Sequence, residues 1–202
     1  MLLHILAAIG ALTVAIVLGI MIFMFFGWLA QPVSYLVRSE EIQRYLRSWG
    51  HAIDDGGRIQ VRQPGTDRSV MFVKRHFKRT GDRLVFRFRN ADAGRSHFAQ
   101  VESALSKGGI SFEMERTPSG RTRAIVIPFP VGDDPLPLAA GAHAARVALA
   151  AMGASEEGPF EMTCTGSQRS DYVRGSVDAI PWTRGHRAGF TIGQVVSRLL
   201  GR

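Results

Sequence analysis

Basic side chains gather in one stretch of the chain, between Arg58 and Asn90. This stretch holds ten Lys and Arg against two Asp, so its excess charge equals that of the whole chain, which is +8. Its clearest strands are predicted at Ser69–Lys78 and Arg83–Asn90, joined by a turn at residues 79–82. Because aligned cations attract anions, this basic hairpin is the first candidate site.

Pairing Phe77 with Leu84 gives the register that we predict for the hairpin. The cations then share one face, which forms the predicted anion, lipid or partner-binding site: Lys74, His76, Lys78, Arg83, Arg87 and Arg89. The other face enters the core, with Arg75 as its one charged member. Like charges directly opposite one another destabilise a sheet, so this register requires anions. Acidic side chains such as Glu113 and Glu115, or lipid headgroups, could supply them, whereas a membrane tether and few exposed aromatics disfavour nucleic acid.

The other residue types that do chemistry form no motif. The chain has no Gly-rich phosphate loop, no G-x-S-x-G and no H-E-x-x-H, and its histidines lack metal-ligand spacing. The single Cys164, on an apolar strand, indicates a core residue rather than a nucleophile. Asp133 and Asp134 precede Pro135, which indicates a turn or helix lead-in rather than paired acids. We therefore expect no enzyme, no metal and no cofactor, with a membrane-surface enzyme of scattered catalytic residues as the alternative.

The element that positions this hairpin is the apolar stretch Ile5–Ala30. It has no charged side chain over about 26 residues, which as a helix measures roughly 39 Å against a hydrocarbon core of about 30 Å. A cleaved signal peptide would have a basic start and a shorter apolar run. The stretch therefore predicts an uncleaved transmembrane signal-anchor, with Phe25, Phe26 and Trp28 at the membrane interface.

The basic residues beside the span predict its orientation. Arg38, Arg44 and Arg47 follow it, whereas only His4 precedes it. Because basic flanks stay in the cytoplasm, we expect a single-pass protein of the cell (inner) membrane with its N-terminus out and its domain cytoplasmic. A periplasmic domain is the alternative.

Small residues recur every fourth position along one side of the span: Ala7, Ala11, Ala15 and Gly19. This spacing lets a second helix approach closely, so it predicts a helix–helix interface with another membrane protein. The alternative is that Ala and Gly are simply common in membrane helices.

The chain divides into an anchor (1–31), an α+β soluble domain (32–166) and a basic, largely irregular tail with a short terminal helix (167–202). The element order after the span is α-β-β-β-α-β-β-α, with an optional last strand at Phe160–Thr165. We expect a mainly antiparallel sheet with helices on one face, and a largely buried apolar helix at Leu138–Met152.

This element order is similar to that of the type III secretion chaperone-like fold, a family of protein-binding modules. The similarity lies in element order alone, so no site residue is carried over. A ferredoxin-like β-α-β-β-α-β arrangement is the competing interpretation, but it would place Arg83–Asn90 centrally without its hairpin partner.

These patterns favour a non-enzymatic, membrane-anchored interaction protein, an accessory or assembly subunit of a membrane protein complex. Its expected partners are the bilayer and other membrane proteins, reached through the span and the domain. An anionic-lipid-binding module is a further alternative, because the basic hairpin is tethered beside headgroups.

Overall fold

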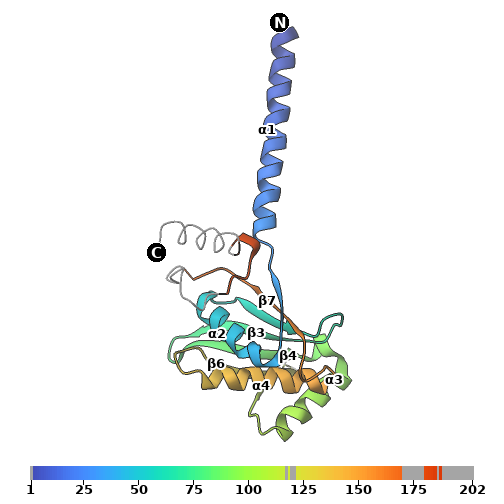
Figure 1. Ribbon diagram of the computed structural model, residues 1–202, viewed down its shortest axis with the longest axis vertical. Helices are drawn as coiled ribbons and strands as arrows, with labels where there is room; N and C mark the ends of the chain where they lie inside the picture. The colour runs from blue at the N-terminus through green and yellow to red at the C-terminus, as the bar shows by residue number, and fades with distance from the viewer. Residues whose placement is uncertain (1, 117, 119–121, 170–179, 186, 188–202) are drawn as a thin grey trace. The chain divides into compact units, whose positions relative to one another are not determined.

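The computed structural model describes residues 2–116, 118, 122–169, 180–185 and 187, with side chains from residue 12 onward except 90–96 and 122–123 (Figure 1). The chain forms two compact units. One comprises Met1–Val33 and Thr183–Arg202, and the other comprises Ser34–Trp182.

Helix α1 (Leu2–Leu29) is the long apolar element of the first unit. Among the described residues it is the one helix long and apolar enough to cross a membrane, and its stretch Leu12–Leu29 is 0% buried. Near its end the rings of Phe25 and Trp28 stack with centroids 6.4 Å apart, and the Arg184 guanidinium lies 5.1 Å from the Trp28 ring. The prediction of an apolar helix of spanning length is confirmed.

The domain is built on one antiparallel sheet, which has seven strands within the described residues, in the order β1-β7-β2-β3-β4-β6-β5. The strands are β1 (Ser34–Val37), β2 (Arg58–Arg62), β3 (Ser69–Phe77), β4 (Gly81–Arg89), β5 (Glu113–Arg116), β6 (Thr122–Pro130) and β7 (Phe160–Thr165). The α+β class with a mainly antiparallel sheet is confirmed. Strand β4 is central and keeps its hairpin partner β3, so the ferredoxin-like arrangement does not apply.

Helices cover one face of this sheet (Figure 1), as predicted: α2 (Ile42–Ala52), α3 (Asn90–Lys107) and α4 (Leu136–Ala151). Phe88 of β4 stacks on Phe98 of α3 with ring centroids 6.1 Å apart. The ring of Phe129 lies against Gly141 of α4, where a Cβ would come within 3.3 Å of it. The absence of a side chain at Gly141 therefore lets α4 approach the sheet closely, and the core lies between the two layers.

Strand β1 is an edge strand that the sequence pattern did not predict. It pairs with β7 from Ser34↔Thr163 to Val37↔Phe160, and a 3₁₀ turn (Ser39–Glu41) leads from it into α2. Four residues offer too few positions for an alternating pattern to stand out.

The predicted register of the β3–β4 hairpin was wrong by three residues. Phe77 pairs with Gly81, and Leu84 pairs with Lys74. The loop is residues 78–80, and Gly81 has φ +71°, the left-handed conformation that closes three-residue hairpins. Because side chains alternate with period two, an odd shift exchanges the faces. On β3 the side chains in the core are therefore the ones predicted to lie on the polar face, Val70, Phe72 and Lys74. On β4 they are Leu84, Phe86 and Phe88, as predicted.

The compact domain continues past residue 166. The Ser48 hydroxyl accepts the Ile180 N–H at 2.9 Å, and the Trp49 indole donates to the Ile180 carbonyl at 2.8 Å. Ile180 and Trp182 are buried, so part of the predicted tail belongs to the core. The predicted terminal helix lies outside the described residues. Helix α4 is largely buried, as expected, through Leu138, Ala145 and Leu149 among others.

Candidate functional site

The structure separates the six residues that were predicted to share one basic face. Lys74 and His76 lie on the helix-covered face, Lys78 lies in the hairpin loop, and the remaining three lie on the opposite face, here called the open face: Arg83, Arg87 and Arg89. The prediction that one face carries all six residues was therefore wrong, because the three-residue shift in register exchanges the two faces of β3 but not those of β4.

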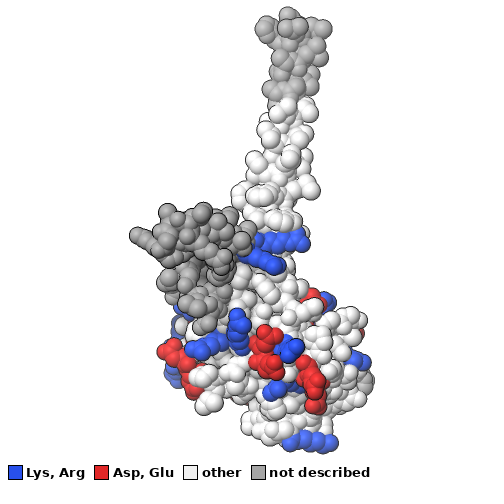
Figure 2. Space-filling model, in the orientation of Figure 1, with Lys and Arg blue, Asp and Glu red and all other residues white. Residues whose placement is uncertain are grey.

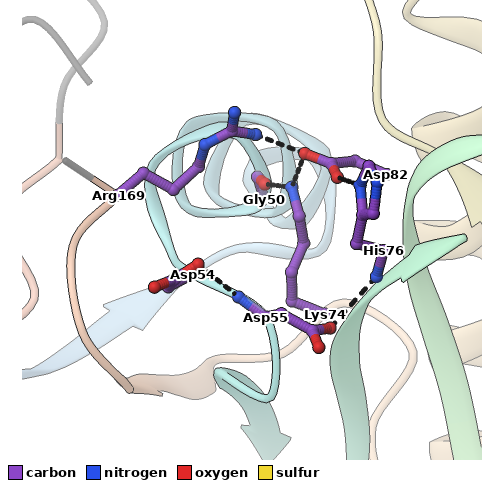
Figure 3. Close-up of polar contacts among 7 residues, drawn as sticks. All are labelled: Gly50, Asp54, Asp55, Lys74, His76, Asp82 and Arg169. Carbon is purple, nitrogen blue, oxygen red and sulfur yellow. Dashed lines mark hydrogen bonds and ion pairs between the residues drawn. The ribbon is translucent and has the colours of Figure 1, made fainter. Parts of the chain in front are cut away.

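Asp82 is the centre of a charged cluster on the helix-covered side of the hairpin (Figure 3). Its carboxylate lies 3.0 Å from Lys74 Nζ and 2.7 Å from His76 Nδ1, and it accepts a hydrogen bond from Arg169. Lys74 Nζ also donates to the carbonyl of Gly50, in the last turn of α2. The cluster thus joins α2, β3, β4 and the segment after β7.

Lys74 is only 1% exposed, although it is a cation. Burial lowers the pKa of Lys74, and Asp82 opposes that change. Partial burial alone would raise the pKa of Asp82, but hydrogen bonds from His76 and Lys74, with the charges of Lys74 and Arg169, outweigh it and lower the pKa from 3.8 to about 2. Burial, followed by the charge of Lys74, lowers the pKa of the nearby His51. Asp82 is therefore a permanent counterion near neutral pH.

The chemistry available to this cluster is structural rather than catalytic. A general base needs a pKa near the working pH, and the pKa of Asp82 is far below it. Lys74 donates to two acceptors and has almost no surface with which to meet a substrate. A cation at the C-terminal end of a helix is favourable, so Lys74 fixes the hairpin to the end of α2.

Sequence reasoning missed Asp82 and Arg169 as site residues. Asp82 was assigned to the turn and Arg169 to the irregular tail, and 87 positions separate them. The signal that could have found them is Gly81, because a three-residue loop that ends just before this glycine turns Lys74 inward, and a buried lysine requires a nearby carboxylate.

The open face is rich in arginine along its central strands: Arg58, Arg62, Arg75, Arg83, Arg87 and Arg89. Acidic side chains neutralise some of these arginines. Arg62 lies 2.6 Å from Glu161, and Arg87 lies 2.5 Å from Glu115. The prediction that Glu115 neutralises part of the basic hairpin is confirmed for Arg87, whereas an ion pair of Glu113 with the hairpin stays a prediction.

The other chemical candidates have structural roles. Cys164 is fully buried, and burial raises the pKa of its thiol, which fits a core residue. Asp134 accepts the N–H of Leu136 at 3.0 Å at the start of α4, as expected for a helix lead-in. Among the described residues, no group of three or more His, Cys, Asp or Glu could hold a metal ion.

The small-residue stripe of the span is only partly described. Ala15 and Gly19 are exposed, and a Cβ at Gly19 would meet nothing within 4 Å, whereas the side chains of Ala7 and Ala11 lie outside the description. The helix–helix interface stays a prediction.

Comparison of the chain with protein-family models, with curated proteins and with solved structures found no match. Functional inference therefore depends on the geometry above.

Proposed function

We propose that the protein is a single-pass, membrane-anchored interaction protein, an accessory or assembly subunit of a membrane protein complex without catalytic activity of its own. The observation that carries the proposal is α1. No charged residue lies within its described stretch, the face seen in Figure 2 is uncharged, and its large apolar side chains are exposed. Such a surface is stable in hydrocarbon and costly in water.

The arginines beside the span support a cytoplasmic domain. Arg38, Arg44 and Arg47 are exposed and follow α1 within about 20 residues in the sequence. Basic residues this close to one end of a span keep that flank in the cytoplasm.

Strand β1 supports contact with a protein partner. It is an edge strand, so one side of it is unpaired within the described residues, and Leu36 on it is 70% exposed. Unpaired edges accept strands from other chains, and an exposed apolar side chain adds area to such a contact.

Site-specific photocrosslinking in native membranes tests this proposal. A photoreactive phenylalanine analogue at Leu36 should give one discrete adduct with another protein chain, because the partner lies on β1. The same analogue at Lys107, an exposed residue at the end of α3, is the matched control and should give none. The absence of a protein adduct at position 36, or equal adducts at both positions, would contradict the interaction role.

A further inference from the structure

We propose that the tip of the β3–β4 hairpin is a second bilayer contact, which binds anionic phospholipid headgroups through Arg75, Arg83 and Lys78 and places Phe77 at the interface. This inference rests on the proposed bilayer anchor and adds a specific lipid class and a site to it.

Three open-face arginines lie together without acidic partners. Arg75 stands directly opposite Arg83, and Arg58, which pairs with Val73, lies one diagonal step away. Within the part of the chain that the structure describes, these three side chains form no ion pair or hydrogen bond, and Arg83 Nε is buried without a partner. Opposed like charges destabilise a sheet, so an external anion at the accessible parts of these side chains would stabilise this arrangement.

Two acids of the open face neutralise other arginines. Glu161 and Glu115 pair with arginines further along this face, at Arg62 and Arg87. Asp82 faces the other side of the sheet, where it contacts Lys74, Arg169 and the ring of His76. Within the described residues, none of these three acids therefore pairs with the arginines at the hairpin end of the open face.

An exposed aromatic ring stands among these cations. Phe77 ends β3 on the same face as Arg75 and is 43% exposed, and the loop beside it carries the exposed Lys78 and Arg79. Aromatic rings favour the headgroup region, and long basic side chains reach phosphates from there. This combination distinguishes a lipid-binding tip from a site for a soluble anion or nucleic acid, neither of which requires one exposed ring at a loop.

Strand β1, the first element after the span in the sequence, begins at this same end of the sheet. Strand β1 begins at Ser34, which pairs with Thr163, and β7 ends two residues later beside Arg58. Residues 30–33 alone separate α1 from β1. A domain tethered by so short a connection, at the end of the sheet that carries the hairpin tip, can bring that tip to the bilayer that holds α1.

Environment-sensitive fluorescence on the full-length chain in nanodiscs tests the proposal. Thr80, in the exposed loop, is replaced by Cys in a Cys164→Ala background and labelled with a nitrobenzoxadiazole dye. In discs of phosphatidylcholine with phosphatidylserine, emission should shift to the blue and be quenched by a lipid-borne quencher. Discs of phosphatidylcholine alone should show neither effect, and added salt should abolish both because it screens the attraction.

Charge-neutralising variants identify the residues responsible. Arg75→Gln with Arg83→Gln should lower the ratio of docked to undocked hairpin about 25-fold, because each cation contributes a factor of roughly five. Arg62→Gln with Lys107→Gln, an equal loss of charge at exposed positions outside the hairpin, is the control and should leave the signal unchanged. Phe77→Ser should reduce the blue shift while leaving the lipid preference in place.

Three results would overturn the inference. The first is an equal signal in both kinds of disc, and the second is an equal loss of signal in the control variant. The third is a dye signal that responds to soluble inositol hexakisphosphate in neutral discs but does not respond to phosphatidylserine. Retention of the chain in the disc, measured by size-exclusion chromatography, reports on α1 alone. Failure of the hairpin contact is thereby distinguishable from failure of the anchor.

Discussion

Replacing Asp82 by Asn tests how strongly the buried Lys74 depends on its counterion. Asn keeps the size of the side chain but removes its charge, so an ammonium that is 1% exposed loses its paired anion. Breaking a buried pair by removing one partner costs about 3–5 kcal/mol. In a domain of this size each kcal/mol lowers the thermal midpoint by roughly 2–4 °C, so we expect a fall of roughly 6–20 °C.

The same substitution should be mild where Lys74 is already Met. Met fills the site with an apolar chain of similar length, and Asp82 keeps His76 and Arg169, whose side chains are 61% and 34% exposed. Such exposed pairs contribute about 0–1 kcal/mol each. Asp82→Asn should therefore cost about 1 kcal/mol in the Lys74→Met background, which leaves a coupling free energy of about 2–4 kcal/mol.

Urea unfolding in a mild detergent, followed by tryptophan fluorescence, measures both single variants, the double variant and the parent. Trp49 and Trp182 are buried in the domain and report its unfolding. Arg62→Gln, which breaks an exposed pair with Glu161, is the control and should cost less than about 1 kcal/mol. An equal cost of Asp82→Asn with and without Lys74 would refute the coupling.

Three further predictions concern acid stability, topology and the span. The folded-state pKa of Asp82, about 2, lies below the ordinary value of 3.8, so its carboxylate stabilises the domain above about pH 4. This contribution, at most about 2.5 kcal/mol, is lost as the pH falls toward 2, and Asp82→Asn should flatten that part of a stability–pH curve. An impermeant thiol reagent should leave the buried Cys164 unlabelled from either side of the membrane. Topology is therefore measured at the exposed position of Ser155→Cys in a Cys164→Ala background. Labelling of this cysteine before cell lysis would contradict a cytoplasmic domain. Ala11→Leu with Ala15→Leu should weaken helix association in the membrane by about 1–2 kcal/mol, and unchanged co-purification of partners would remove that interface.

Long, strongly patterned elements of this fold could be predicted from the sequence, and the register between them could not. The apolar run of α1, the alternation in β3 and β4 and the apolar character of α4 are local signals. The hairpin register depends on one backbone feature, the left-handed Gly81, and on burying Lys74. A buried lysine contradicts the usual hydrophobic pattern and becomes acceptable only beside a carboxylate that folding supplies.

The parts missed altogether depend on contacts between distant segments. Strand β1 exists because β7, more than a hundred residues later, offers it an edge. Ile180 and Trp182 were assigned by composition to an irregular tail, yet Ser48 and Trp49 hold this segment through hydrogen bonds to Ile180. No local pattern encodes such docking, and it also brings Arg169 to Asp82.

The intact mass of the protein that stays in alkaline-washed membranes tests whether an uncleaved α1 anchors the chain. Alkaline washing strips peripheral proteins but leaves a spanning helix in the bilayer, because removing it would expose its apolar surface to water. We expect the chain to stay with the membranes at a mass that includes Leu2–Leu29. Recovery of a shortened chain without this helix, released into the wash, would contradict it.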